Sequence, residues 1–306
     1  MKQRILIIKH GALGDFIFSI TSMQEIKKRY PDAHLTLLTT KPFVEMAKQS
    51  GFFDDIIVDA RSHNPKEWWR ICKRVLADGQ FDLIFNIQLS KRVQKRYYTL
   101  ARLLTKNSFH WGNVLNDGVN FIHVPAKPRL TWGKETCDFM PLPWEQSDLS
   151  FLKGEQKHFH LLPKKYVLLI PGCSLGHPYK RWPATHYAAL ATKLAEQGIA
   201  CVVLGTPAEA EEGNYIATHS PKTVNFIGKS SLLDIPALAI KSSAVVGNDT
   251  GPTHMACLCH KPVIVLFSQK TAHAARDFSN VTNFIASDIA DISVETVFQK
   301  CMQILS

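Results

Sequence analysis

Short apolar runs alternate with amphipathic segments along most of the chain. The run at 5–8 (Ile-Leu-Ile-Ile) is continuously apolar, which is typical of a parallel strand buried on both faces. The next segment has apolar residues at helical spacing, namely Phe16, Ile17, Ile20, Met23 and Ile26. The same alternation predicts strands at 34–39, 55–58 and 82–87 and helices at 42–50, 65–78 and 91–104. This pattern predicts a parallel, doubly wound α/β domain.

A second alternation follows an irregular stretch at about 105–163. It predicts strands at 166–170, 200–204, 223–227, 244–248 and 262–267 and helices at 184–197, 208–218, 232–241 and 293–305. We place the crossing between the two alternations at 154–163. The expected domains are therefore 1–155 and 164–290, with a last segment, 291–306, whose helix packs back on the first domain.

Length and charge narrow the class of protein. A chain of 306 residues is long enough for two domains, and 45% hydrophobic with 20% charged residues is normal for a globular protein. A formal net charge of +10 indicates an anionic partner, which could be nucleic acid, a phospholipid surface or a phosphorylated small molecule. Seven cysteines without repeated spacing favour a reducing compartment. With no apolar signal segment, the sequence predicts a cytoplasmic protein.

The stretch 244–256 has the pattern of an anion site. An apolar strand breaks at Asp249, Thr250 and Gly251 and then enters a helix that contains Thr253. The amides and dipole at a helix start attract phosphate, although Pro252 removes one donor. An ordinary turn between a strand and a helix, without a bound ligand, explains the same pattern equally well. His254 is expected to be a packed helix residue.

Other polar loops are expected at the same edge of the second sheet. Ser174 follows its first strand, Lys180 precedes the next helix, and Glu209 follows its second strand. A lysine, hydroxyls and a helix start suit a diphosphate, and a carboxylate suits a sugar hydroxyl. The absence of G-x-G-x-x-G and of G-x-x-x-x-G-K-[ST] argues against NAD-enzyme and P-loop classes.

The first domain also carries charged residues after its strands. Asp15 lies in the first turn of a predicted helix, where it either complements the helix dipole or serves as a functional carboxylate at the end of a central strand. Arg61 and Lys91 belong to basic clusters after two other strands. Such clusters are often solvated faces, but these two fall on the same predicted rim as Asp15.

Three motifs in order resemble bacterial heptosyltransferases of glycosyltransferase family 9. They are Gly-x-x-Gly-Asp at 11–15, Lys-Arg-Trp-Pro at 180–183, and Val-Gly-Asn-Asp-Thr-Gly-Pro-Thr-His-Met-Ala at 246–256. The resemblance implies a GT-B architecture of two Rossmann-like domains facing a cleft. It also implies inverting, metal-independent transfer from ADP-heptose on the C-terminal domain to the lipopolysaccharide inner core, at Kdo or heptose, on the N-terminal domain.

The resemblance also implies residue roles. Asp15 would be the catalytic base, and Asp249 would grip donor-sugar hydroxyls. The diphosphate would be held by Lys180 and by the Thr250, Gly251 and Thr253 amides. Ser174 is a further phosphate candidate, Glu209 a ribose candidate and Ser230 a candidate near the adenine. Arg61 and Lys91 would meet the anionic acceptor.

No metal and no bound cofactor are expected, because ADP-heptose is a co-substrate. The expected partners are this donor, the anionic core acceptor and, by peripheral contact, the inner-membrane surface. Two alternatives remain open from the residues. One is a GT-B transferase or epimerase that uses another nucleotide sugar. The other is a non-catalytic nucleotide or nucleic-acid binder, although the basic residues are not interleaved with the aromatics of a single-strand platform.

Overall fold

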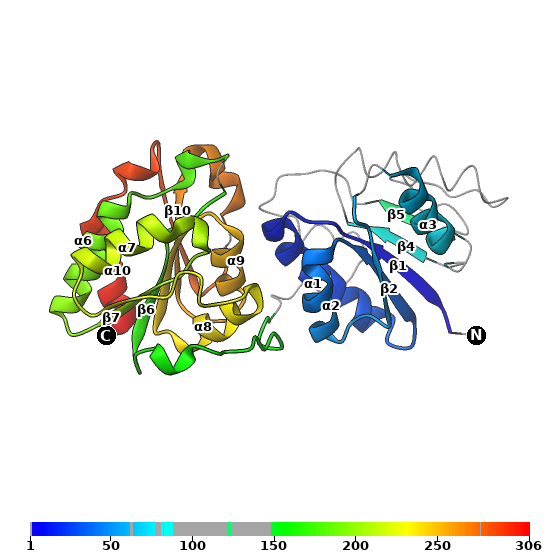
Figure 1. Cartoon of the computed structure of the whole chain (residues 1–306), viewed down its shortest axis with the longest axis horizontal. Coiled ribbons are helices and arrows are strands. Elements are labelled where there is room, and N and C mark those ends of the chain that lie inside the picture. The colour runs from blue at the N-terminus through cyan, green and yellow to red at the C-terminus, as the bar shows by residue number, and fades with distance from the viewer. Residues whose placement is uncertain are drawn as a thin grey trace. The chain divides into compact units, whose positions relative to one another are not determined.

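The chain forms two α/β units, Met1–Ser147 and Asp148–Ser306 (Figure 1). The structure is a computed structural model that describes residues 2–61, 64–76, 81, 83–87, 121–123, 148–174, 176–275 and 277–306. The division comes before the crossing that we expected at 154–163. The reason is that Leu149 and Leu152 are buried in the second unit, where the Leu149 amide donates to the Leu258 carbonyl at 3.1 Å.

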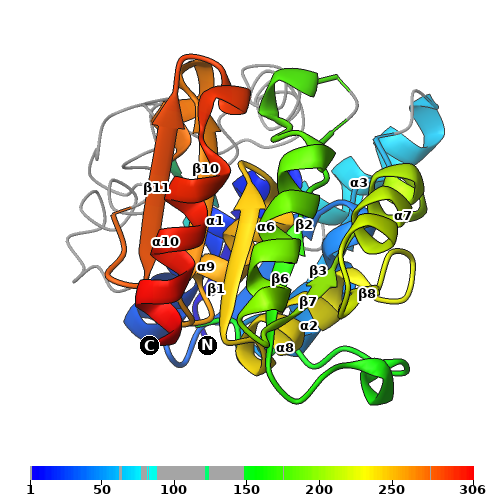
Figure 2. The ribbon, with the colours of Figure 1, turned by 90° about the vertical axis from the view of Figure 1, so that its left-hand side faces the viewer.

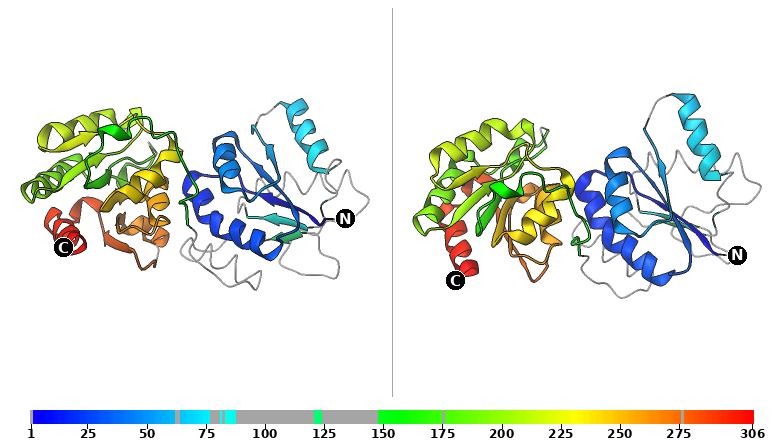
Figure 3. Two further views of the ribbon diagram at one scale, coloured as in Figure 1. Left: turned by 90° about the horizontal axis from the view of Figure 1, so that it is seen from below. Right: turned by 60° about the horizontal axis from the view of Figure 1, so that its bottom comes forward.

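The first unit is a parallel sheet with the strand order β3-β2-β1-β4-β5. Its strands are β1 (Arg4–Ile8), β2 (His34–Thr39), β3 (Asp55–Val58), β4 (Leu83–Asn86) and β5 (Phe121–His123). Its helices are α1 (Leu13–Arg29), the 3-10 turn η1 (Lys41–Phe43), α2 (Val44–Ser50) and α3 (Pro65–Leu76). Helices α1 and α2 cover one face of the sheet, and α3 lies on the other (Figure 3). The helix predicted at 91–104 lies outside the described residues.

The second unit is a parallel sheet with the order β11-β10-β9-β6-β7-β8. Its strands are β6 (Tyr166–Ile170), β7 (Ala200–Val203), β8 (Thr223–Asn225), β9 (Ala244–Asn248), β10 (Val263–Ser268) and β11 (Val281–Ala286). Its α-helices are α6 (Ala184–Glu196), α7 (Ala210–His219), α8 (Ile235–Lys241), α9 (Gly251–Cys257) and α10 (Val294–Leu305). Its 3-10 turns are η3 (Phe159–Leu161), η4 (Pro178–Lys180), η5 (Pro207–Glu209), η6 (Leu232–Asp234), η7 (Gln269–Ala274) and η8 (Ile289–Asp291).

The last helix corrects one expectation about the domains. Helix α10 buries its apolar face beside α6 on the second sheet (Figure 2), whereas we expected that face to pack on the first domain. Its apolar residues Val297 and Cys301 are fully buried in the cluster that contains Val167 and Leu194. The amphipathic helix thus finds its apolar partner in the unit that it directly follows.

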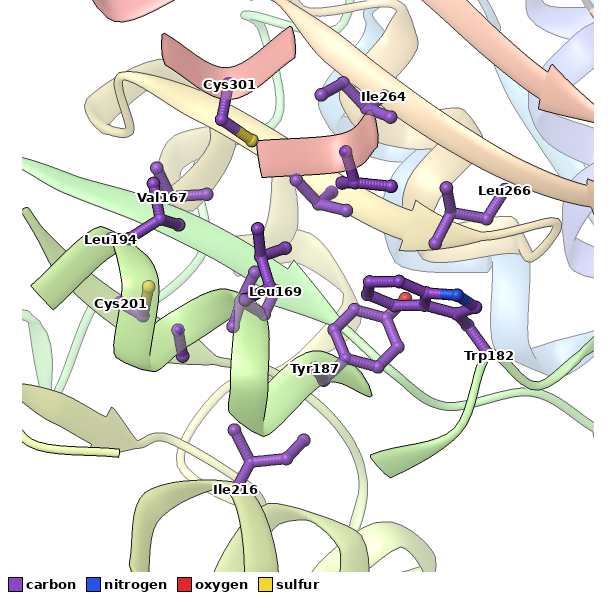
Figure 4. Close-up of a cluster of buried hydrophobic side chains, with 14 of the residues drawn as sticks. Val167, Leu169, Trp182, Tyr187, Leu194, Cys201, Ile216, Ile264, Leu266 and Cys301 are labelled. Atoms are coloured by element: carbon purple, nitrogen blue, oxygen red, sulfur yellow. The ribbon is translucent and has the colours of Figure 1, made fainter. Parts of the chain in front are cut away.

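An aromatic pair anchors the chain after β6. The Trp182 and Tyr187 rings pack edge to face with centroids 4.9 Å apart, inside the apolar cluster of Figure 4. The Trp182 indole N–H donates to the Ile292 carbonyl at 2.9 Å, so that this buried polar atom is satisfied. This anchor fixes the chain only two residues beyond Lys180.

In each sheet the order reverses at the first strand of the unit. The reversal lies between β1 and β4 in the first unit and between β6 and β9 in the second. Loops on the two sides of such a point diverge and leave a crevice at the carboxyl ends of the strands, where open α/β sheets bind ligands. These two carboxyl edges are the places to look for a site.

Candidate functional site

A lysine, an aspartate and a histidine meet at the carboxyl edge of β9. The Lys180 ammonium donates to Oδ2 of Asp249 at 2.6 Å, and Nε2 of His254 lies 2.8 Å from Oδ1 of the same carboxylate. Lys180 comes from the loop after β6 and Asp249 from the loop after β9, so the pair spans the strand reversal. The predicted convergence of these loops is confirmed, and it also includes His254.

Burial and charge compete at Asp249. The Asp249 side chain is 4% exposed, and this burial on its own raises the pKa of the carboxyl. The hydrogen bonds and charges of His254 and Lys180 outweigh burial and hold the pKa well below its usual range. The site therefore contains an ionised carboxylate whose charge is compensated by neighbouring donors.

The Asn248 carboxamide ties the loop after β6 to β9. Its Nδ2 donates to the Pro171 carbonyl at 2.6 Å, and its Oδ1 accepts from the Trp182 amide at 3.2 Å and the Tyr187 hydroxyl at 3.0 Å. Asn248 and Tyr187 are both fully buried. Sequence reasoning did not assign Asn248 a role, although it lies inside the motif at 246–256.

The start of α9 lies close against its strand. A Cβ added at Gly247 would come within 2.4 Å of Oγ1 of Thr253, so no larger residue fits there without displacing the Thr253 side chain. Thr250 occupies the N-cap position, and its hydroxyl lies 3.1 Å from that of Thr253. Thr250, Gly251 and Thr253 are thus adjacent to Asp249, as predicted, and their phosphate-binding role stays a prediction.

Two other predicted donor residues have local partners. Glu209 is buried, and its carboxylate accepts from the Thr206 amide at 2.8 Å and hydroxyl at 2.6 Å in a capping box. A Cβ added at Gly172 would lie 3.0 Å from the Glu209 side chain, which places Glu209 beside the loop after β6. Ser174 is exposed, and its hydroxyl lies 2.8 Å from Nδ1 of His177.

Ser230 lies apart from this group, in the half-buried loop after β8. The neighbouring Ser231, and not Ser230, forms a capping box with Asp234 at the start of η6. The structure does not join Ser230 to the cluster around Asp249, and its adenine-binding role stays a prediction.

In the first unit, Asp15 is half-buried in the first turn of α1. The loop that delivers it is tightly packed: Gly11 has φ of 112°, and a Cβ there would lie 2.6 Å from Cε2 of Phe43. Phe43 in turn stacks on Phe16 with ring centroids 4.3 Å apart. Gly11 is therefore required both by its left-handed backbone and by the lack of space.

A buried histidine–aspartate pair lies at the same edge. Nε2 of His10, directly after β1, is 3.2 Å from Oδ2 of Asp59, directly after β3. Burial lowers the pKa of His10, and this effect exceeds the opposing effect of Asp59. Sequence reasoning missed this pair, because neither His10 nor Asp59 belongs to a motif that would have singled it out.

Asp59 also holds the predicted acceptor residue Arg61. Its Oδ1 accepts from the Arg61 amide at 2.7 Å, and Arg61 has φ of 52°, in the left-handed region that is unfavourable for arginine. The Arg61 side chain is exposed.

Lys9, which is fully buried, donates from Nζ to the Ile87 carbonyl at 3.3 Å across the β1–β4 reversal. The second acceptor candidate, Lys91, lies outside the described residues.

Neither a metal-binding group nor a membrane-spanning helix is found in the described part of the chain. No three His, Cys, Asp or Glu side chains there are grouped so that they could hold an ion. None of the described helices has the length and hydropathy to cross a bilayer. Metal independence remains a prediction.

Comparisons with known proteins agree on one family. The model of glycosyltransferase family 9 (heptosyltransferase) matches residues 134–300. Lipooligosaccharide heptosyltransferase 2 of Haemophilus ducreyi is 37% identical over 287 residues, which are 85% of this chain and 81% of that protein. Lipopolysaccharide heptosyltransferase 2 of Escherichia coli is 30% identical over 161 residues, which are 47% of this chain and 45% of that protein. Three of the alignments with curated heptosyltransferases, including this one, span only 35% to 45% of the relative's length.

A solved structure has the same fold along the whole chain. The E. coli heptosyltransferase WaaC, solved with ADP, has a TM-score of 0.75 at 17% identity and covers 99% of this chain and 100% of its own. This likeness identifies the fold as GT-B, with two Rossmann-like units, as the sequence resemblance implied. The family model and the Haemophilus ducreyi relative show that this chain belongs to glycosyltransferase family 9, the heptosyltransferases.

Proposed function

We propose that this protein transfers a heptose from ADP-heptose to Kdo or heptose in the inner core of lipopolysaccharide, with inversion and without a metal. The observation that carries the proposal is the cluster of Lys180, Asp249 and His254 at the β6–β9 reversal of a family 9 chain. The ADP in the solved WaaC structure supports an adenine nucleotide as the leaving group.

The donor site would use charge that the fold has already arranged. An ammonium has three N–H donors, so Lys180 can keep one on Asp249 and direct the others to a diphosphate. The start of α9 would add amide donors. Ser174, in the loop after β6 that also leads to Lys180, would be a further phosphate contact. The ionised Asp249 accepts hydrogen bonds only, which suits a sugar hydroxyl, and Glu209 would hold the ribose.

The acceptor hydroxyl would be activated in the first unit. In a single inverting displacement, the acceptor oxygen forms a bond to the anomeric carbon, the bond to the diphosphate oxygen breaks, and Asp15 takes the hydroxyl proton. Lys180 and the α9 amides would stabilise the charge that develops on the departing ADP. Arg61 and Lys91 would bind the anionic acceptor from the rim of the same sheet.

Transfer assays with defined components test the proposal. The full chain is incubated with ADP-heptose and either a Kdo-terminated or a heptose-terminated core acceptor, and the products are weighed by mass spectrometry. We expect a product heavier by one heptose with one of these acceptors and release of ADP. Transfer or epimerisation with a UDP-sugar, together with no reaction of ADP-heptose, would instead support the alternative GT-B activity.

The expected location of the protein is the cytoplasm, with peripheral contact at the inner face of the membrane.

A further inference from the structure

Helix α3 presents a tryptophan surrounded by basic residues to solvent. Trp69 is 55% exposed, the largest exposed fraction among the large hydrophobic side chains that the structure describes. Lys66, Arg70 and Lys73 are exposed on the same helix, while Ile71 and Cys72 are buried toward the sheet. The apolar anchoring of α3 therefore does not need Trp69.

The spacing places these four side chains on one surface. Residues three and four positions apart are neighbours on a helix, so Lys66 and Lys73 flank Trp69, and both also neighbour Arg70. The only acidic residue between 65 and 76 is Glu67, which is half-buried. Arg74 is bonded to Asp55 at 2.9 Å, so its charge is compensated within the unit. We call Lys66, Trp69, Arg70 and Lys73 the α3 face.

We propose that the α3 face docks on the surface of an anionic phospholipid membrane. A tryptophan ring with its N–H is suited to the headgroup region, where one end is apolar and the other is wet. Lysine and arginine stems can lie along the lipid while their charges reach anionic phosphates. Because α3 buries its own apolar residues in the unit, the docking is shallow, electrostatic and sensitive to salt.

If the proposed function holds, docking through the α3 face would place the acceptor-binding edge of the first sheet near the membrane. Arg61, a predicted acceptor residue, precedes α3 by four positions and is exposed. A core glycan attached to lipid is confined to the membrane surface. Docking through α3 would therefore bring the acceptor edge of the first sheet to the plane in which the acceptor moves.

Vesicle binding by the full chain tests the proposal. The vesicles contain phosphatidylcholine alone or with added phosphatidylglycerol, and binding is measured by flotation at low and high salt. The wild type is expected to float only with the anionic vesicles and at low salt. The triple variant Lys66→Gln/Arg70→Gln/Lys73→Gln should bind about a hundredfold more weakly, since each basic residue contributes about fivefold at such a surface. Trp69→Ala should also weaken binding while the charge is unchanged.

Matched controls separate the α3 face from general charge. Lys48→Gln removes an exposed lysine, 3.7 Å from Glu45, from α2 on the opposite face of the sheet, and Tyr215→Ala removes an exposed aromatic from α7. Both should bind vesicles like the wild type. Equal losses in controls and α3 variants would overturn the proposal, as would salt-sensitive binding of the α3 face to DNA with no binding to anionic vesicles.

A soluble acceptor separates this proposal from the proposed function. With a delipidated core acceptor, the α3 variants should keep the wild-type kcat and KM, because the α3 face is not part of the transfer site. Vesicle binding that depends on the α3 face, in a protein that transfers no sugar, would refute the function and leave the docking surface standing. Normal transfer with α3-independent vesicle binding would refute the docking surface alone.

Discussion

Lys180 Nζ lies 2.6 Å from Oδ2 of Asp249, and the lysine reaches this aspartate from a loop on the other side of the strand reversal. The lysine and aspartate side chains are 16% and 4% exposed, so the pair is largely removed from water. Removing one partner of a buried ion pair leaves the other charge uncompensated. Loss of either side chain should therefore destabilise the fold as well as alter the candidate donor site.

We predict that Lys180→Met lowers the free energy of unfolding by about 3 kcal/mol, at the lower end of the usual range because His254 remains beside Asp249. Lys193→Met is the control, since Lys193 pairs with Glu295 at 3.0 Å on an exposed surface, where such pairs contribute at most about 1 kcal/mol. Urea unfolding of both variants provides the measurement. If both variants lost the same free energy of unfolding, the Lys180–Asp249 pair would contribute no more to stability than an exposed ion pair, and the prediction would be wrong.

Burial of His10 predicts a dependence of stability on pH. The folded pKa is lowered, so below about pH 6.5 the unfolded chain binds a proton at this residue that the folded chain does not. Stability should therefore fall as pH decreases through this range, by up to about 1.4 kcal/mol per pH unit from this group. His10→Gln keeps a donor for Asp59 and removes the titration. Its urea midpoint should change less between pH 7.5 and pH 5.5 than that of the wild type (roughly one unit either side of the free histidine value), and an identical change would contradict the role of His10.

We predict that Asp15→Asn lowers kcat by about 100-fold or more, the usual scale for loss of a general base. Asparagine keeps the size and the capping ability of aspartate but cannot take the proton. ADP affinity and melting temperature, measured on the same variant, should stay close to wild type. Normal turnover would reduce Asp15 to a residue that complements the dipole of α1.

Arg61→Ala and Lys91→Ala are expected to raise the KM for the acceptor while ADP affinity stays unchanged. The reason is that both residues belong to the first unit, which we propose binds the acceptor. Arg74→Ala is a control on the same domain, because its guanidinium is bonded to Asp55 at 2.9 Å. A parallel loss of ADP affinity in the Arg61 and Lys91 variants would move these residues to the donor side.

Chelation should leave the transfer rate unchanged. Lys180 and the start of α9 can supply the positive field that a divalent ion supplies elsewhere. The measurement is the initial rate of ADP release before and after dialysis against EDTA. A loss that magnesium restores would show that an ion takes part.

The apolar pattern predicted most of the sheet because parallel strands are buried on both faces. The strand at 166–170 has its predicted bounds, and all five of its residues are buried. Strand β11 (Val281–Ala286) was missed because it is an edge strand with half-buried and exposed positions, so its sequence contains no continuous apolar run. Pattern reading thus found the central strands, whereas among the edge strands it found β3 and β8 and missed β5 and β11.

Residues of the candidate site were predictable from the sequence only where they belong to a recognisable motif at the carboxyl edge of a sheet. Lys180 and Asp249 were placed together because parallel strands end at a common edge. His10 and Asp59 also follow parallel strands that end at a common edge, but neither residue belongs to a motif, so neither was considered as a site residue. The packing of α10 was also misjudged, because an amphipathic helix shows which face it buries but not against which unit.

The Asn248 carboxamide joins the end of β9 to Pro171, Trp182 and Tyr187 through both of its polar atoms. A displacement of Asp249, the next residue, is therefore passed to the loop after β6, which also carries Lys180. Any motion of one segment that keeps these hydrogen bonds also moves the other. Opening and closing of the candidate donor site would then be a single motion, shared by its lysine and its carboxylate.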